Sequence, residues 1–239
     1  MTQTMLLVFA RAIGLVARAP GFSHPSVPAM VRVAFALVLA WCVGAGVPAH
    51  APFGLAAFVI AIVGEAALGA AIGTGASLLY DGAYYAGRFI DDYVGVRGSV
   101  PNASVTSAQG FGRLWSAVFL AGFFLLDGYA IVVHVFAESF ARVEVGGFVT
   151  VAGWNAFAFA LPTTIVHAAL GFAAPAITVA AVVQLALAAV ARVVPRLSSF
   201  SLAFPIVFGG VLLATIVTIP LFAPLAARPW LVLPFGDAR

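Results

Sequence analysis

The sequence predicts an all-α, multi-pass membrane protein of about six apolar helices. Of its 239 residues, 64% are hydrophobic and 8% are charged, and the mean hydropathy is +1.14. Soluble domains carry about 25% charged residues, so this chain has too few polar side chains to cover a globule in water. Strands that span a membrane alternate in polarity over about ten residues, whereas the apolar runs here are continuous, which favours helices.

Six apolar stretches supply these helices, because a bilayer core of about 30 Å is crossed by about 20 helical residues. The stretches are residues 5–16, 27–47, 53–80, 114–136, 151–191 and 200–222. Arg11 interrupts the first stretch, and Pro162 and Pro175 are expected to break the fifth. Asp127 and His134 lie within the fourth.

The arginines predict the orientation of these helices. The loops after the first, third and fifth stretches contain six arginines, while those after the second and fourth contain one. The positive-inside rule therefore places the odd loops in the cytoplasm and both termini outside. All eleven basic residues are arginines, spread singly with no basic patch, so nucleic acid is not an expected partner.

The connection 81–113 has two parts. Its beginning, "DGAYYAGRFIDDYVGV", has aromatic residues at helical spacing and predicts an amphipathic helix. The following "RGSVPNASVTSAQGFGR" has the Gly, Ser, Pro and Asn content of a loop. Loops of this length in compact proteins are usually functional or disordered.

Glu65 is the charge that the sequence places deepest in an apolar helix, within "IVGEAALGAAIGTG". A charge at the bilayer centre costs about 2.5–3.5 kcal/mol on insertion scales, so it usually faces a partner or a water-filled cavity. A structural pair with an arginine of another helix or subunit is favoured over a proton or ion site. Arg32 and Asp127 are grouped with Glu65 as buried charges used in assembly. Gly69 and Gly73 have the small-xxx-small spacing that predicts close helix packing.

Motifs of enzymes are not found in the sequence. It has no GxSxG, Walker-type or CxxC motif, and Cys42 is its only cysteine, so we expect no enzyme activity, cofactor, disulfide or metal. His134 and Glu138 share a helix face, which indicates a surface hydrogen bond rather than metal ligands. The alternative function is a small-molecule or ion transporter in which Glu65, Asp127 and His134 form an intramembrane relay.

Four segments in a fixed order resemble one family, and the resemblance extends over about residues 5–222. The segments are "FARAIGLVARAPGFSHPSVPAMVRVAFALVLAW", "GEAALGAAIGTG", "LLDGYAIVVHVFAESF" and "ARVVPRLSSFSLAFPIVFGGVLL". They are similar to the FliR proteins of the bacterial flagellar export gate and to their injectisome counterparts, SctT. The sequence departs from the family at the last corner, where Arg196 and Ser198 replace the usual Gln and Asn.

The resemblance implies a non-enzymatic subunit of the export gate of type III secretion, a multi-pass protein of the bacterial inner membrane. Its implied partners are FliP-like, FliQ-like and FlhB-like subunits, exported unfolded proteins and membrane lipid. The helices would form hairpins, some of them buried against partner subunits instead of lipid. Residues 1–170, including the 81–113 connection, would be the FliP-like part, and residues 171–239 the FliQ-like hairpin and tail.

The resemblance also assigns two sites. The loop after the third helix corresponds in position to a segment that plugs the closed pore. The expected plug residues are Gly98, Pro101, Gly110, Phe111 and Gly112. The corner before the last helix would be a cytoplasmic hairpin tip, where Pro195 ends one helix and a serine caps the next. The tip residues are Arg192, Pro195, Arg196, Phe200 and Pro205.

Overall fold

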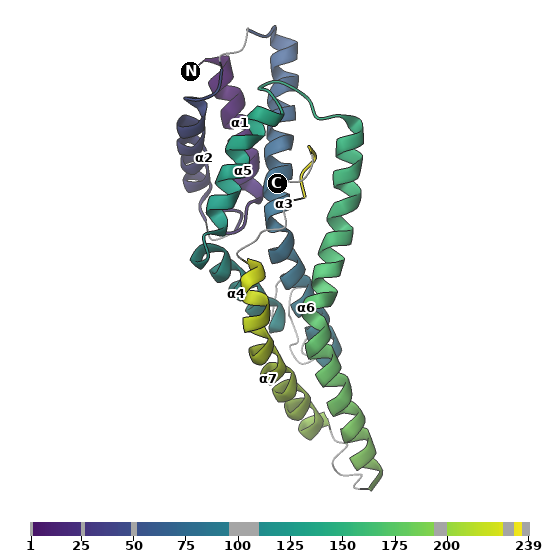
Figure 1. Cartoon of the computed structure of the whole chain (residues 1–239). Coiled ribbons are helices and arrows are strands. Elements are labelled where there is room, and N and C mark those ends of the chain that lie inside the picture. Colours follow the sequence, from purple (N-terminus) through teal and green to yellow (C-terminus); the bar gives the residue numbers. More distant parts are fainter. Residues whose placement is uncertain are drawn as a thin grey trace. The chain divides into compact units, whose positions relative to one another are not determined.

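The computed structural model describes residues 2–24, 27–48, 52–95, 110–193, 200–226 and 232–235. Across these ranges the chain is all-helical, which confirms the predicted fold class (Figure 1). The helices are α1 (Gln3–Arg18), α2 (Ala29–Gly44), α3 (Leu55–Val94), α4 (Phe111–Leu125), α5 (Gly128–Arg142), α6 (Val151–Val193) and α7 (Phe200–Ala226).

Three helices are long and apolar enough to cross a membrane: α3, α6 and residues Ala203–Phe222 of α7. The pair α4 and α5 adds a fourth candidate if the two helices form one bent span. The chain is therefore a membrane protein with several spans.

The fourth predicted stretch is two helices rather than one. The chain leaves the helical conformation at Asp127, whose φ of 57° lies in the left-handed region, and Gly128 begins α5. The axes of α4 and α5 differ by 68°. A left-handed residue cannot continue a right-handed helix, so the bend follows from this one position.

The expected breaks at Pro162 and Pro175 are wrong, because α6 continues through both prolines over 43 residues. Each proline removes one backbone donor from the helix. Prolines are tolerated within membrane helices because other groups and small local adjustments can satisfy the freed backbone carbonyls.

The described chain forms two compact units. Unit 1 consists of residues 1–78, 123–163 and 228–239, and unit 2 of residues 79–122 and 164–227. The division into a FliP-like and a FliQ-like part concerns ancestry rather than compactness and stays a prediction.

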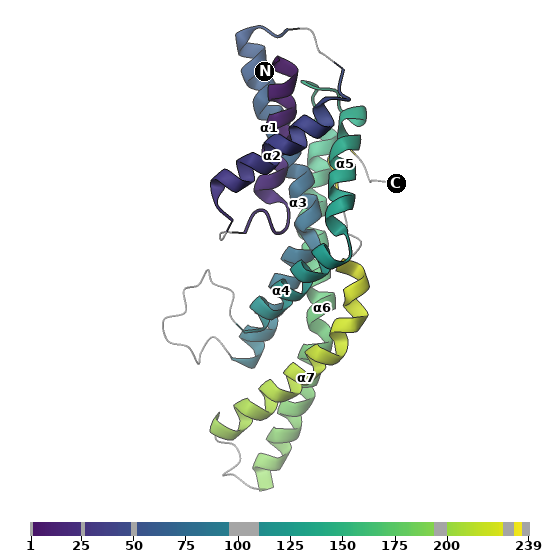
Figure 2. The same ribbon diagram turned by 90° about the vertical axis from the view of Figure 1, so that its left-hand side faces the viewer.

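Unit 1 is organised around α1, which lies against both α2 and α3 (Figure 2). Its contact with α3 is made backbone to backbone. A Cβ at Gly69 would collide with the Arg11 carbonyl oxygen, and one at Gly73 would lie 2.6 Å from the Leu15 carbonyl oxygen. Gly14 on α1 is equally close to the backbone of α3. The close packing predicted from the glycine spacing is confirmed, and it brings the first and third helices together.

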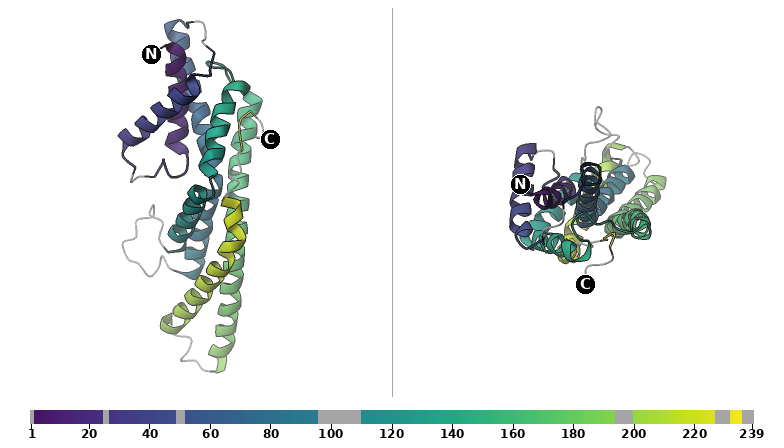
Figure 3. Two further views of the ribbon diagram at one scale, coloured as in Figure 1. Left: turned by 60° about the vertical axis from the view of Figure 1, so that its left-hand side comes forward. Right: turned by 90° about the horizontal axis from the view of Figure 1, so that it is seen from above.

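Unit 2 has a core of aromatic side chains. The second half of α6 runs beside α7 (Figure 3), and α4 packs against both. The Trp115 ring stacks on Phe172 at 6.1 Å, and Phe172 contacts Phe222 edge-on at 5.0 Å. Gly87 of α3 admits the backbone of Phe111 and Gly112 at the start of α4.

Candidate functional site

Arg11 of α1 and Glu65 of α3 form an ion pair in the core of unit 1. Their side chains are 0% and 1% exposed. Arg11 Nε donates to Glu65 Oε2 at 2.5 Å, and Arg11 Nη2 donates to Oε1 at 3.1 Å. This two-bond geometry is the strongest that an arginine and a carboxylate adopt. Gly14, Gly69 and Gly73 allow it, because they bring the two helix backbones close enough together.

Other groups form hydrogen bonds with the Arg11 and Glu65 atoms beyond the two bonds of the ion pair. Arg11 Nη1 donates to the Ser139 hydroxyl at 2.9 Å, and Nη2 donates to the Val143 carbonyl at 3.0 Å. The Gly146 amide donates to Glu65 Oε1 at 2.8 Å. The guanidinium carbon lies 4.0 Å from the centre of the Phe140 ring, a cation–π contact. The site thus joins α1, α3, α5 and the turn after α5.

This arrangement suits a structural role, in which the ion pair holds α1, α3 and α5 together, better than proton transfer. A buried ion pair is tolerated when its geometry is good and its remaining donors and acceptors are bonded, as they are here. Both carboxylate oxygens of Glu65 accept from Arg11, and this pairing favours the charged form of the side chain. Of the two alternatives for Glu65, the geometry favours the pair with an arginine of another helix.

The sequence contains a signal for the partner of Glu65. Arg11 interrupts the first apolar stretch, and a charge is as costly there as Glu65 is in the third stretch. Two opposite charges, each inside an apolar helix, are expected to find each other. Ser139 and the Val143 carbonyl had no such signal, because both come from the fold of α5 and its C-terminal turn.

The other predicted charges lie elsewhere. Asp127 is exposed in this chain, because the left-handed turn between α4 and α5 carries it out of the helix. Its burial in an assembly stays a prediction. Arg32 is half-buried and donates to the His24 carbonyl at 2.8 Å. His134 is exposed on α5, so the structure does not favour a relay through Glu65, Asp127 and His134. Within the described ranges, no three His, Cys, Asp or Glu side chains are placed to share a metal ion.

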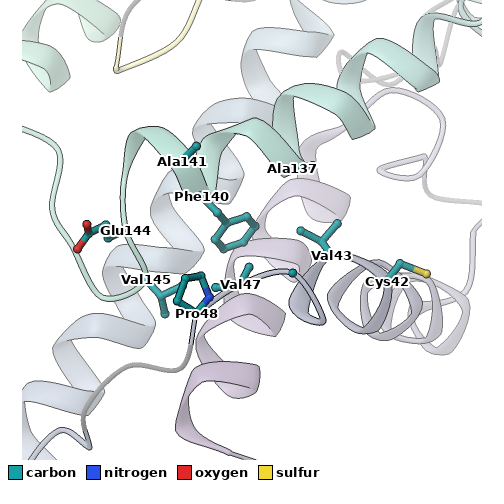
Figure 4. A pocket seen from close by; sticks show the side chains of 10 residues that line it. Cys42, Val43, Val47, Pro48, Ala137, Phe140, Ala141, Glu144 and Val145 are labelled. Atoms are coloured by element: carbon teal, nitrogen blue, oxygen red, sulfur yellow. The ribbon is translucent and has the colours of Figure 1, made fainter.

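An open groove of about 710 Å³ lies beside the ion pair. It runs between the C-terminal ends of α2 and α5, and Figure 4 shows Phe140, Val47 and Pro48 facing its middle. The Phe140 ring also makes the cation–π contact with the Arg11 guanidinium. Cys42 and Glu144 lie at opposite ends (Figure 4).

The plug residues are only partly described. Gly98 and Pro101 lie outside the described residues. Gly110 has a φ of 59° and precedes α4. Phe111 and Gly112 form the first turn of α4 rather than part of the loop. Phe111 is 2% exposed, and its ring lies 5.3 Å from that of Phe208 in the core of unit 2.

Asp91 fixes this start of α4 and was not predicted to do so. Its Oδ1 accepts from the Phe111 amide at 2.8 Å, and Oδ2 accepts from the Gly112 amide at 3.1 Å. The carboxylate is 2% exposed. It therefore caps the positive end of α4 from the last turn of α3, where the sequence had suggested only a polar helix face.

At the predicted hairpin tip, Arg192 is exposed in the last turn of α6, and Phe200 begins α7. Pro205 is exposed within α7, about one turn from its start. Pro195 and Arg196 lie outside the described residues. The described part of the corner agrees with two helices that run side by side in unit 2.

The chain matches a known protein family over most of its length. A family model described as bacterial export proteins, family 1, matches residues 2–231, nearly the whole chain. A search of individually curated proteins finds no significant match. The seven helices, the several candidate spans and this match agree with one another, and the chain belongs to family 1 of the bacterial export proteins, the FliR/SctT family of the flagellar and type III secretion export apparatus.

Proposed function

We propose that the chain is a non-catalytic subunit of the inner-membrane export gate and forms part of its protein-conducting pore. In this proposal it assembles with FliP-like, FliQ-like and FlhB-like subunits, and unfolded substrates pass through the complex. The ion pair of Arg11 and Glu65 holds α1, α3 and α5 in the arrangement that the partners bind.

The observation that carries the proposal is the apolar helix surface that the chain leaves uncovered. In the most apolar 18-residue segment of α6, and in that of α7, only 17% of the residues are buried within the chain. At 1.5 Å per residue, the 43 residues of α6 extend over about 65 Å, whereas a bilayer core is about 30 Å thick. Lipid covers only part of such a helix. Large exposed apolar surfaces that lipid does not cover are typical of protein interfaces.

Co-expression tests this proposal. We expect the chain to be degraded when produced alone and to accumulate when its FliP-like and FliQ-like partners are produced with it. The measurements are a pulse-chase half-life and co-purification in mild detergent. A chain that is stable alone, stays monomeric and binds a small ligand would instead support the transporter.

Two variants of Glu65 separate locking from proton transfer. Charge reversal, Glu65→Lys, should prevent assembly because it places two cations in one buried site. Glu65→Gln preserves the size and some hydrogen bonding of the side chain. If this variant assembles normally but no longer supports secretion, a proton-linked role is favoured over a structural one.

The plug is a second part of the proposal. Support comes from Asp91, which holds the end of α3 against the start of α4 and so anchors both ends of the intervening segment at one place. Deleting residues 99–109 should make the assembled gate permeable to small ions, measured as dye or ion leak in cells with the complete apparatus. A membrane that stays tight would contradict the plug.

A further inference from the structure

The segment Val232–Phe235, near the end of the chain, packs into unit 1 although it follows the last helix. Leu233 is 6% exposed and belongs to the hydrophobic core built by α1, α2, α3 and α5. Pro234 is buried, and Phe235 packs against the same core. Figure 1 draws this segment in yellow beside α3. Four residues that are not helical thus form part of the interior of the unit.

The surface against which this segment packs, called its seat, includes two glycines, Gly75 and Gly153, that leave room for the main chain. A Cβ at Gly75 of α3 would collide with the Val232 carbonyl oxygen, and its next neighbours would be the Val232 carbonyl carbon at 3.4 Å and amide nitrogen at 3.5 Å. All three nearest atoms belong to the tail. The tail is therefore what a methyl group at position 75 would meet first, and its release would remove these three closest contacts.

Two further contacts complete the seat. A Cβ at Gly153, in the first turn of α6, would collide with the Pro234 carbonyl oxygen. The Arg142 guanidinium carbon, at the end of α5, lies 5.9 Å from the centre of the Phe235 ring. The two carbonyls, two residues apart, meet glycines of two different helices. The segment is held by its main-chain shape and by its apolar side chains, of which Leu233 belongs to the core and Phe235 packs against it.

We propose that Val232–Phe235 is a strap that locks α3, α5 and α6 of unit 1, and that its seat is a binding site for a non-helical apolar segment with a central leucine. The segment ends in a turn at Pro234 and Phe235, and the carbonyls of Val232 and Pro234 face glycines of two different helices.

A mutant cycle tests the strap. Gly75→Ala should lower the unfolding midpoint of the detergent-solubilised full chain, because the methyl group expels the Val232 carbonyl. Leu233→Asp should release the strap by itself. In the Leu233→Asp background, Gly75→Ala should raise the midpoint, because alanine is the better helix former once the space is free. Gly171→Ala is the matched control: Gly171 has nothing within 4 Å, so it should raise the midpoint equally in both backgrounds.

Two further measurements do not depend on how well Leu233→Asp folds. Amide hydrogen exchange at Leu233 and Phe235 should quicken in Gly75→Ala and stay unchanged in Gly171→Ala. A fluorescent peptide, LVLPFG, should bind the Leu233→Asp chain and not the natural chain, while LVDPFG should bind neither. The proposal is overturned if Gly75→Ala shifts the midpoint alike in both backgrounds, or if exchange in the tail does not respond to it. Failure of LVLPFG to bind would overturn the peptide site.

Discussion

Arg11 and Glu65 depend on each other because neither side chain reaches water. Every bond that the guanidinium makes is to a group inside unit 1, and the carboxylate accepts from Arg11 and from the Gly146 amide. Removing one partner leaves a buried charge with no counterion, whereas replacing both by apolar residues leaves none. This asymmetry distinguishes the buried pair from the exposed pair of Glu138 and Arg142, at 2.7 Å on α5.

Arg11→Met is therefore predicted to destabilise the chain by about 3–5 kcal/mol, and the double variant Arg11→Met, Glu65→Leu to recover most of that loss. The free energy of unfolding in detergent measures both. Glu138→Gln, which breaks an exposed i,i+4 pair, should cost about 0.3–0.5 kcal/mol. An Arg11→Met chain as stable as this control would show that the ion pair does not lock the unit.

A second prediction concerns the backbone contact beside the ion pair. Gly69→Ala places a methyl group against the Arg11 carbonyl, so α1 and α3 have to move apart. We expect a loss of about 1–3 kcal/mol, typical of overpacking, together with longer bonds between Arg11 and Glu65. Gly209→Ala on α7 is the control, since nothing lies within 4 Å of it. Equal stability of the two variants in thermal unfolding would contradict the close contact.

The start of α4 is held by another element. Its first two amides donate to Asp91, which lies near the end of α3. Helix N-termini have free backbone donors, and a carboxylate there also interacts favourably with the helix dipole. The cap consequently ties the ends of α3 and α4 together, and Gly87 lets their backbones touch one turn earlier.

Asp91→Ala should lower the stability of unit 2 by about 0.5–2 kcal/mol, the usual cost of losing a cap. The more specific signature is faster amide exchange at Phe111 and Gly112, while the amides of α7 keep their protection. Asp92→Ala, an exposed neighbour on the same helix, is the control. Unchanged exchange at the start of α4 would mean that Asp91 is not the cap that matters.

Helix positions were predictable from the sequence, while their ends and partners were less so. Continuous apolar runs located every helix, because lipid and protein interiors select the same side chains. The split at Asp127 depends on one left-handed residue, and α6 continues through both of its prolines; neither feature leaves a periodic pattern in the sequence. Glu65 was identifiable by its cost in an apolar helix, but the Asp91 cap and the seat of the tail arise from contacts between residues distant in sequence.

At the scale of the whole molecule, the long helices set limits on any membrane arrangement. Both α3, with 40 residues, and α6, with 43, are about twice as long as a bilayer core requires. A helix of this length that crosses the bilayer has a portion outside the hydrocarbon layer. Where the membrane boundary falls along them depends on the arginines at their ends and on the subunits that cover them.

The arginine distribution predicts that the corner between α6 and α7 lies in the cytoplasm. In a Cys42→Ala background, which removes the only natural thiol, Arg192→Cys should react with a membrane-impermeant maleimide in inverted vesicles and not in intact spheroplasts. A cysteine at position 48, in the second loop, should show the opposite pattern. Labelling of position 192 from outside would reverse the topology.

The ion pair also affects the order in which the helices can pack during synthesis of the chain. The ribosome makes Arg11 54 residues before Glu65 and 128 residues before Ser139. At about 5–20 residues per second, the guanidinium waits roughly 3–11 s for its carboxylate. During that interval the guanidinium has no counter-charge within the chain. We therefore expect α1 to reach its final position only after α3 has been made, so that the packing of the first helix is delayed until its partner exists.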